Sequence, residues 1–543
     1  MFKFFLRVFT TLFFQVIFLQ FIYAQVSTVD SLETTLLNWY NQDLELDRVP
    51  GISTERVYKE ILPNKASKKT VIVAIIDSGV DIYHEDLEGK IWINEGEIAG
   101  NEIDDDNNGY VDDVHGWNFI GNDKGENIQL ENFEYTRIYR KYSSEFASIS
   151  SNSEVSKEEE KEYVAYRKSK ELYEKNLMKY KNEQEGILIF EEIFLAAKEI
   201  IKSETGINPI SLKDLKSIKT KDKKTSKAIS FLIDRYKMGL TEEKISEYKN
   251  HTEECLDKHL NLEFNPREII GDNPFDINDT KYGNNNVKGP RSDHGTSVAG
   301  VVAANRNNGI GINGVAKNVK LMILRTVPQG DEYDKDVALA IKYAADNGAN
   351  IINMSFGKEM SPNKEFVDEA IRYAASKNIL MINSSGNSAL DVDKIDMYPT
   401  DILTDGTIVE SWINVGASTK YKSNSIAAEF SNYGEKNVDI FAPGKDIISL
   451  EPENLYSMSD GTSLSSPIVT GVAALVWSYY PELSAVQLKE ILLNSSRKIK
   501  KGKVLFPDLE SEKRPKGKFS QLSVSGGVLN AYSAMKMAEL ISE

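Results

Sequence analysis

The feature that most constrains the fold of this chain is a short apolar run at residues 71–76, which ends at Asp77-Ser78-Gly79. An uninterrupted apolar run of this length is typical of a strand that is buried on both faces of a parallel sheet. Comparable runs recur downstream, at residues 321–327, 351–356, 379–383 and 413–416. We therefore expect a set of buried parallel strands, with functional side chains near their carboxyl ends.

Helical patterns fill the stretches between these runs. Two stretches each place their apolar residues on one helical face, namely Val337, Ala340, Ile341 and Ala344, and Phe366, Ala370, Ile371 and Ala374. Alternation of strands and helices predicts a mostly parallel sheet with helices on both faces. The expected fold class is therefore α/β with three layers.

The start of the chain has the pattern of a secretory signal peptide over residues 1–24. Lys3 and Arg7 are its only charged residues, an apolar stretch follows them, and Ala24 offers a small residue for cleavage. A retained membrane anchor is the alternative interpretation. Cleavage predicts a secreted or periplasmic protein without a membrane partner, in which residues 25–69 form a short N-terminal segment.

The charge balance of the chain excludes some classes of partner and favours others. Lysine and arginine total 65 and aspartate and glutamate total 82, so the formal charge is −17. Nucleic acid is excluded as the main partner, because a polyanion needs a basic surface. Binding of cations is favoured. Cys255 is the only cysteine, which rules out an intramolecular disulfide and a zinc site built from cysteines.

Residues 123–285 differ from the rest of the chain, because lysine and glutamate crowd this segment. Its tyrosine and apolar residues recur at helical spacing, for example at Tyr163, Tyr166, Tyr173, Leu177 and Tyr180. Such patterns predict amphipathic helices in a small bundle or hairpin. Two interpretations of this helical insertion stay open. It is either a lid or arm that docks a partner through its tyrosine face, or a solvated elaboration without a role in substrate choice.

Three polar residues stand in contexts that suit nucleophilic catalysis. Asp77 ends a buried strand, where a carboxylate can orient an imidazole, and His294 opens a helix rich in small residues. Ser463 precedes Pro467, which is tolerated in a first helical turn, so free N–H groups are expected near the serine hydroxyl. Singly, each has an ordinary explanation, as a strand-end cap, a core histidine or a helix cap. Their order along the chain matches one known order of a Ser-His-Asp triad.

Several short motifs resemble those of the subtilisin-like serine proteases, or subtilases. They are Asp77-Ser78-Gly79-Val80-Asp81, His294-Gly295-Thr296, Asn353-Met354-Ser355-Phe356-Gly357, Ser384-Ser385-Gly386-Asn387, Phe441-Ala442-Pro443-Gly444 and Gly461-Thr462-Ser463-Leu464-Ser465-Ser466-Pro467. The resemblance covers residues 70–122 and 286–543, which form the expected peptidase domain around the insertion. It implies a subtilisin-like fold and a secreted serine endopeptidase that hydrolyses proteins or peptides through an acyl-enzyme. A non-catalytic protein-binding module on the same scaffold is the alternative.

The resemblance also implies roles for individual residues. It makes Asp77, His294 and Ser463 the catalytic triad and Asn387 the side-chain donor of the oxyanion hole. A neutral amide suits that role, because it directs an N–H at charge that develops only in the transition state. Substrate binding, as an added strand and in the neighbouring pocket, is implied at Ser355, Phe356, Gly357, Ser385 and Gly386.

Two features depart from the family pattern. Asp77 and His294 are 217 positions apart, because the insertion lies between them. A surface loop absorbs such a length at small entropic cost. Only residues 25–70 precede the strand that ends at Asp77, which is too short for a conventional folding propeptide.

Two loops carry oxygen atoms at spacings that favour structural Ca²⁺. One resembles the first half of an EF-hand loop, with Asp104, Asp106, Asn108, Tyr110 (through its carbonyl) and Asp112 as expected ligands. The other resembles a calcium loop of subtilases, with the expected ligands Asp86, Asn308, Ile310 and Ile312. The alternatives are a solvated acidic turn for the first loop and an ordinary tight turn for the second.

Overall fold

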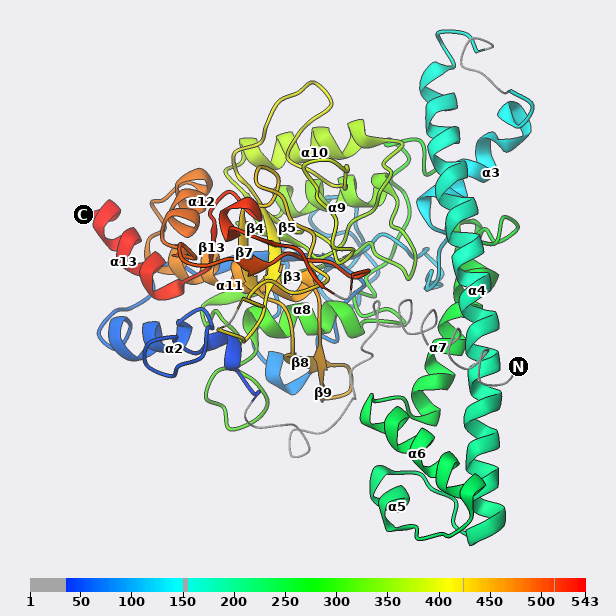
Figure 1. Ribbon diagram of the computed structural model, residues 1–543. Helices are drawn as coiled ribbons and strands as arrows, with labels where there is room; N and C mark the ends of the chain where they lie inside the picture. The colour runs from blue at the N-terminus through cyan, green and yellow to red at the C-terminus, as the bar shows by residue number, and fades with distance from the viewer. Residues whose placement is uncertain (1–35, 150–154, 423, 512) are drawn as a thin grey trace. The chain divides into compact units, whose positions relative to one another are not determined.

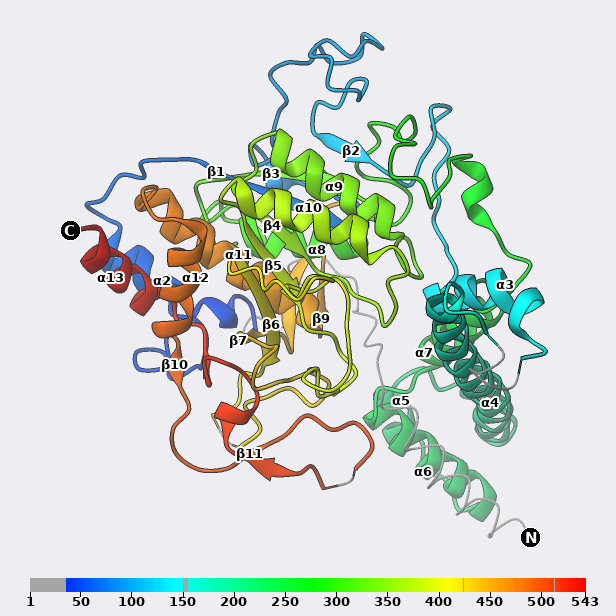
Figure 2. The same ribbon diagram turned by 90° about the horizontal axis from the view of Figure 1, so that it is seen from above.

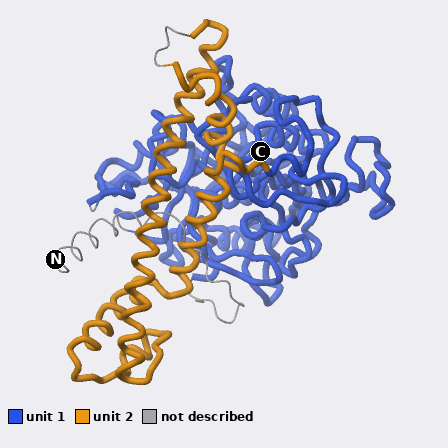
Figure 3. Tube along the Cα trace, turned by 90° about the vertical axis from the view of Figure 1, so that its right-hand side faces the viewer, with its two compact units in different colours: residues 1–131, 266–543 blue, residues 132–265 orange. Residues whose placement is uncertain are grey.

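The computed structural model describes residues 36–149, 155–422, 424–511 and 513–543. The expected signal peptide at residues 1–24 lies outside this part of the chain. Two compact units are present: residues 1–131 together with 266–543, and residues 132–265 (Figure 3). The second unit falls within the expected insertion at 123–285.

The first unit is built on a nine-stranded sheet in the order β10-β13-β7-β6-β5-β4-β1-β3-β2. All neighbouring strands are parallel except the pair β10 and β13. The five apolar runs identified in the sequence correspond to β1, β3, β4, β5 and β6. The strands are β10 (Arg497–Lys498), β13 (Gly527–Val528), β7 (Ile440–Pro443), β6 (Trp412–Ser418), β5 (Leu380–Ser384), β4 (Ile351–Met354), β1 (Val71–Asp77), β3 (Val319–Arg325) and β2 (Gly116–Asn118).

Helices cover both faces of this sheet (Figure 1). In β1, alternate side chains face opposite layers: Val73 and Ile75 join the core formed with α8 and α11, whereas Ala74 and Ile76 join the core formed with α9 and α10. The expected three-layer α/β fold is thereby confirmed. The helices are α8 (Asp293–Ala303), α9 (Asp334–Asp346), α10 (Lys364–Ser376), α11 (Thr462–Tyr479), α12 (Ala485–Asn494) and α13 (Ala531–Ser542).

Smaller elements decorate the first unit. The hairpin of β8 and β9 precedes α11 and packs on α8, and Figure 2 shows the chain between β1 and β2 looping away from the sheet. The remaining elements are α2 (Thr54–Arg56), β8 (Ile447–Glu451), β9 (Leu455–Ser459), β11 (Val504–Leu505), β12 (Lys516–Gly517) and the short helices η2 (Trp39–Asn41), η3 (Val57–Ile61), η4 (Glu85–Leu87), η7 (Pro266–Ile269) and η8 (Phe519–Gln521).

The N-terminal segment belongs to the core of the first unit. Trp39, Tyr40 and Ile52 are fully buried and pack in the cluster that contains α8 and α11. The indole Nε1 of Trp39 donates to the carbonyl of Asp446 at 2.8 Å. The amide of Ala531, which opens α13, donates to the carbonyl of Ile52 at 2.7 Å. The segment is therefore held between parts of the chain that come much later in the sequence.

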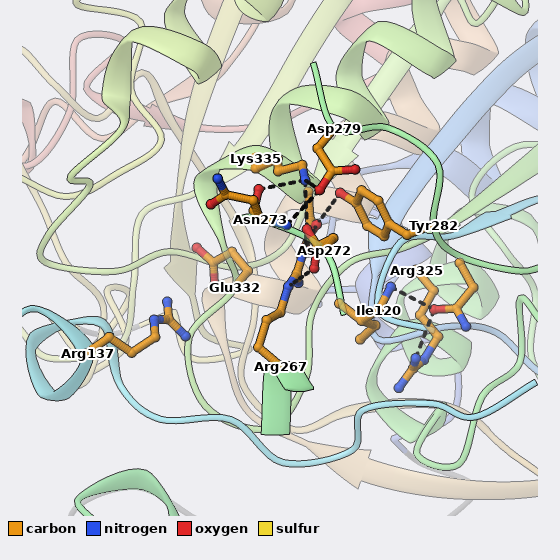
Figure 4. A network of polar contacts seen from close by, with 12 residues as sticks. Ile120, Arg137, Arg267, Asp272, Asn273, Asp279, Tyr282, Arg325, Glu332 and Lys335 are labelled. Atoms are coloured by element: carbon orange, nitrogen blue, oxygen red, sulfur yellow. Dashed lines mark hydrogen bonds and ion pairs between the residues drawn. The ribbon is translucent and has the colours of Figure 1, made fainter. Parts of the chain in front are cut away.

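A buried ionic network fastens the segment after residue 265 to α9 (Figure 4). The guanidinium of Arg267 bonds Asp272 through two contacts of 2.7 Å and Asp336 through contacts of 2.6 and 2.9 Å. Lys335 also donates to Asp272, and the hydroxyl of Tyr282 donates to Asp336. Each buried charge thus has an opposite charge beside it, which a low-dielectric interior requires.

The second unit is helical, as the sequence pattern predicts. Its helices are α3 (Glu134–Phe146), α4 (Glu160–Thr205), α5 (Leu212–Ser217), α6 (Lys223–Lys237), α7 (Glu242–Glu254) and η6 (Cys255–His259). The long helix α4 packs against α3, α6 and α7. It ends at Thr205, and the following Gly206 has a positive φ of 71°, the left-handed conformation that commonly terminates helices.

The tyrosine stripe of this unit is part of its own core. Tyr163, Tyr166 and Tyr173 are buried, and the ring of Tyr139 on α3 stacks on Tyr173 at 4.7 Å between centroids. The expectation that a partner docks on this tyrosine face is therefore wrong, because α3 already covers it. Within the described ranges, no helix is both long enough and apolar enough to cross a membrane.

Candidate active site

Asp77 and His294 meet at the carboxyl edge of the sheet. Asp77 is the last residue of β1, and His294 is the second residue of α8. The Nδ1 atom of His294 lies 2.7 Å from Oδ1 of Asp77. Asp77 is 1% exposed, whereas 41% of the His294 side chain is exposed. The Nδ1 edge of the imidazole is therefore held by a buried carboxylate, while part of the ring stays accessible to solvent.

Small residues permit this close approach of α8 to the turn after β1. A Cβ atom at Gly295 would lie 2.1 Å from the carbonyl oxygen of Gly79, which no side chain could tolerate. The amide of Gly295 donates to the hydroxyl of Ser78 at 3.2 Å. The glycine that follows the histidine is thus required by packing.

The carboxylates around His294 determine its protonation. Burial disfavours the charged imidazolium, but the charge and hydrogen bond of Asp77, with further contributions from Asp293 and Glu451, raise the pKa of His294 to about 9. A histidine with this pKa loses its proton only under alkaline conditions. It can then accept a proton at Nε2 while Nδ1–H stays bonded to Asp77.

Ser463 and Asn387 lie together at the start of α11. Ser463 is the second residue of the helix, which packs against α8. A Cβ atom built on Gly461 would lie 2.8 Å from Oγ of Ser463 and 3.6 Å from both Nδ2 of Asn387 and the amide nitrogen of Ser463. The hydroxyl of Ser463, its amide nitrogen and the Asn387 side chain therefore lie close to one another beside Gly461.

Thr462 orients the Asn387 amide. The backbone N–H and the hydroxyl of Thr462 both donate to Oδ1 of Asn387, at 2.9 and 2.8 Å. The hydroxyl of Thr462 also accepts from the amide of Gly386 at 3.1 Å. This fixes which end of the amide is turned toward Ser463. The motifs did not predict this role of Thr462, although its position directly before Ser463 was a usable signal.

The residues expected to bind substrate lie at the carboxyl ends of β4 and β5. The hydroxyl of Ser355 donates to the carbonyl of Ser463 at 2.9 Å, so the chain after β4 contacts the start of α11. Phe356 is largely buried, and its carbonyl accepts from Asn383 at 3.1 Å. Ser385 is buried and donates to Asn432, while Gly357 follows Phe356 and Gly386 follows Ser385. The structure thus brings all five residues to the same edge of the sheet as Asp77.

Comparison with known proteins identifies the family of the chain. The model of the subtilase family, Peptidase_S8, matches residues 68–514. The chain belongs to the subtilase family. The resemblance seen in the motifs is thereby confirmed.

Individual relatives match parts of this subtilase. The thermophilic serine proteinase of Bacillus sp. (strain AK1) is 37% identical over 188 residues, which are 34% of this chain and 43% of the relative. Subtilisin DY of Bacillus licheniformis is 35% identical over 205 residues, which are 37% of this chain and 70% of that protein. A solved protease structure from Pseudoalteromonas arctica PAMC 21717 is 25% identical, covers 48% of this chain and 80% of that chain, and gives a TM-score of 0.38. The subtilase spans about half or less of the length of the first curated relatives that it matches.

In the acidic loop, the structure brings together Glu97, Asp106 and Asp113. One carboxylate oxygen from each lies within 4.8 Å of the others. Burial and the neighbouring carboxylates raise the pKa of Glu97, and burial raises the pKa of Asp113. Converging carboxylates of this kind suit Ca²⁺, because the cation is hard and relieves their repulsion.

Of the ligands expected in this loop, only Asp106 belongs to the converging set. The carboxylate of Asp104 accepts from the amides of Asn108 and Gly109, and that of Asp112 accepts from the amides of residues 100–102. These side chains shape the turns of the loop. The side-chain oxygen of Asn108 accepts from the amide of Tyr110 at 2.8 Å. Glu97 and Asp113 were missed, because they lie outside the spaced pattern.

The second expected calcium loop is closed by hydrogen bonds. Asp86 accepts from the Asn308 amide at 2.6 Å, from the backbone N–H of Ile312 at 3.1 Å and from the hydroxyl of Tyr456 at 3.2 Å. The backbone N–H of Ile310 donates to the side-chain oxygen Oδ1 of Asn308 at 3.2 Å. Hydrogen-bond donors thus contact both oxygens of Asp86, and the calcium site expected at Asp86, Asn308, Ile310 and Ile312 stays a prediction.

Proposed function

We propose that this subtilase is a serine endopeptidase that hydrolyses peptide bonds through a covalent acyl-enzyme on Ser463. The observation that carries the proposal is the 2.7 Å contact between His294 and the buried carboxylate of Asp77, on a helix that packs against the helix bearing Ser463. Family membership supports the same chemistry.

In the first step, Oγ of Ser463 attacks the scissile carbonyl carbon, and Nε2 of His294 takes the hydroxyl proton. Asp77 holds Nδ1–H and stabilises the imidazolium that forms. The carbonyl oxygen becomes negatively charged. It is stabilised by the side-chain N–H of Asn387 and the backbone N–H of Ser463, which act most strongly in the transition state.

In the second half of the cycle, the tetrahedral intermediate collapses and the C–N bond breaks. His294 returns its proton to the departing amine, which leaves an ester between Ser463 and the acyl half of the substrate. Water then attacks this ester, with His294 again accepting the proton, and the acid product departs as Ser463 regains its hydrogen. No group beyond this chain and water is needed for the proton balance.

The substrates that this site suits are proteins or peptides whose backbone is held beside Ser355, Phe356 and Gly357. Main-chain pairing of that kind accepts many sequences, and side chains add preference. The N-terminal pattern at residues 1–24 supports a secreted or periplasmic location. The carboxylates of Glu97, Asp106 and Asp113 would hold a structural Ca²⁺, which would tie the acidic loop together and raise stability.

The helical insertion is proposed to restrict which substrates are cleaved. It forms a compact unit with its own apolar core, so it can be removed as a block. Replacing residues 132–265 with a short Gly/Ser linker is expected to change the ratio of cleavage rates for a folded protein and a small chromogenic peptide several-fold. A folded, active variant with an unchanged ratio would show that the insertion has no role in substrate choice.

The activity is tested with a serine-directed fluorophosphonate probe and casein digestion. The purified protein is expected to be labelled at Ser463 and to cleave casein, and the Ser463→Ala variant is expected to fold with neither property. Binding of polypeptides without labelling or cleavage would favour the non-catalytic module instead. Casein cleavage by Ser463→Ala at the parental rate would show that another residue is the nucleophile.

A further inference from the structure

A buried arginine without an acidic partner lies beside the turn that follows Asp77. Arg325 is the last residue of β3 and pairs in register with Asp77, the last residue of β1. Only 1% of the surface of Arg325 is exposed. The guanidinium Nε donates to the carbonyl of Ser78 at 2.9 Å, Nη1 donates to Oδ1 of Asn118 at 2.9 Å, and Nη2 donates to the carbonyl of Ile128 at 2.7 Å.

All three acceptors are neutral. None of the ion pairs between described side chains includes Arg325, in contrast to Arg267 in the same unit, which bonds two carboxylates (Figure 4). Burial alone lowers the pKa of Arg325 to about 9. A buried charge without a counter-charge is unfavourable by several kcal/mol, and an apolar residue of similar volume is often as good for stability. The three hydrogen bonds therefore have to offset the cost of burying the guanidinium.

The guanidinium links three segments of the chain through its acceptors. Ser78 directly follows Asp77, Asn118 ends β2, and Ile128 lies in the loop after it. The planar fork of an arginine fixes several oxygens in one plane, which a lysine cannot do. The carbonyl of Asp77 is held by the same strand end, because it accepts from the amide of Thr326 at 3.0 Å.

The chain that leads into α8 packs directly on the guanidinium. A Cβ atom at Gly289 would lie 2.2 Å from Nε of Arg325, so the backbone there rests directly on the guanidinium. The neighbouring residue Val287 accepts from the amide of Val80 at 3.0 Å. The turn that carries Asp77 is thus held between β3 and the chain that leads into α8.

We propose that Arg325 is a positioning residue for Asp77. Its fork fixes the carbonyl of Ser78 and thereby the direction of the Asp77 carboxylate, which in turn orients His294. This inference rests on the proposed function, because the direction of Asp77 matters to the rate only if the triad operates. Arg325 itself touches neither the substrate nor the reacting atoms.

The expected signature is a loss of turnover without a loss of substrate binding. Misplacement of a catalytic group by about 1 Å can reduce the rate by about 10²-fold. Arg325→Ala is therefore expected to lower kcat by about 10- to 100-fold with KM unchanged. Arg325→Lys keeps the charge but lacks the fork, so it is expected to lower kcat nearly as much.

The test measures kcat and KM for a chromogenic peptide with and without millimolar guanidinium chloride. Active enzyme is counted by fluorophosphonate titration, and sodium chloride at equal ionic strength is the salt control. Guanidinium is expected to restore kcat of Arg325→Ala several-fold and to leave the parent unchanged. The matched control is Arg514→Ala, because Arg514 also donates to main-chain carbonyls, those of Phe506, Ala427 and Leu505. Its kcat is expected to be parental and insensitive to guanidinium.

Three outcomes would overturn the inference. They are a parental kcat in Arg325→Ala, a loss that guanidinium does not relieve, and an equal loss and rescue in Arg514→Ala. If Arg325→Ala does not fold, Arg325→Lys decides: a lowered kcat with parental KM supports the inference, and a parental kcat overturns it. A parent that neither labels nor cleaves overturns the proposed function itself, whereas an active parent with unaffected Arg325 variants overturns only the role of Arg325.

Discussion

His294 and Asp77 form a hydrogen bond of 2.7 Å in which the acceptor is buried and much of the donor side chain is exposed. This asymmetry separates two tasks. The buried carboxylate sets the direction and the charge of the imidazole, and the exposed part of the ring is left for the reaction. The protonation of this pair therefore has measurable consequences for activity.

Activity is expected to rise with pH into the alkaline range. The imidazole must be neutral to accept the Ser463 proton, and the pKa of His294 is raised to about 9. Below that pH, kcat/KM should increase about tenfold per pH unit. The raised pKa stabilises the folded protein below about pH 6.5, and this contribution is lost as the pH rises through about 9. Stability should thus fall over the range in which activity rises.

The measurement is a pH–rate profile of kcat/KM with unfolding curves at the same pH values. In Asp77→Asn the rising limb should move to lower pH, with a loss of activity of about 10⁴-fold. Asp293→Asn is the matched control. The carboxylate of Asp293 is exposed and raises the pKa of His294 less than Asp77 does, so its removal should move the limb only slightly. A limb that is unchanged in Asp77→Asn would contradict the assignment.

Removal of the Asn387 side chain is expected to reduce turnover and spare binding. Asn387→Ala should lower kcat by about 10²- to 10³-fold, the usual effect of one oxyanion donor, with little change in KM. Asn494→Ala, at an exposed position that ends α12, serves as the control. Because Thr462 orients the amide, Thr462→Val should produce a smaller loss of the same kind. Equal kcat values in Asn387→Ala and the parent would rule out an oxyanion role.

Calcium is expected to stabilise the protein through the acidic loop. A ligand that binds only the folded state raises the melting temperature by mass action. The parent should melt at a higher temperature in millimolar CaCl₂ than in excess chelator, and Glu97→Gln combined with Asp106→Asn should abolish the difference. Asp396→Asn removes an exposed carboxylate elsewhere and should leave the difference intact. A parent melting temperature that is indifferent to calcium would exclude the site.

Breaking the ionic network of Arg267 is expected to be far more costly than breaking a surface pair. Arg267→Met removes a positive charge from two buried carboxylates, those of Asp272 and Asp336. This loss should lower the free energy of unfolding by about 3–5 kcal/mol. The surface pair of Arg372 and Asp405 provides the control, and Arg372→Met should cost about 0–1 kcal/mol. Urea unfolding of both variants measures the difference, and similar values for the two would contradict it.

The sequence predicted the elements whose residues act locally. The apolar run before Asp77 and the helical face that contains Ile341 are set by period and burial, and both were found where expected. Such patterns do not predict contacts between residues that are distant in the sequence. The sequence did not reveal that Thr462 orients Asn387, or that Arg325 bonds the carbonyl after Asp77, because these contacts exist only once the strands are assembled.

The acidic loop shows a different limit of sequence reasoning. Alternate oxygen atoms suggested Asp104 and Asp112 as ligands, but backbone N–H groups of the loop recruit both carboxylates. The converging set instead draws on Glu97 and Asp113, which flank the pattern. Because backbone N–H groups of the loop also donate to both oxygens of Glu97, the converging set differs from Asp104 and Asp112 in the approach of its carboxylates to one another, which the spacing along the sequence does not reveal.

The bonds from Trp39 to Asp446 and from Ala531 to Ile52 make the native position of the N-terminal segment depend on residues that come much later in the chain. The hydroxyl of Tyr40 donates to the carbonyl of Asn313, 273 positions downstream, Trp39 bonds Asp446, 407 positions downstream, and Ile52 accepts from the still later Ala531. A chain that stops short of α13 keeps the contacts of this segment with Asn313 and Asp446 but lacks the amide that bonds Ile52.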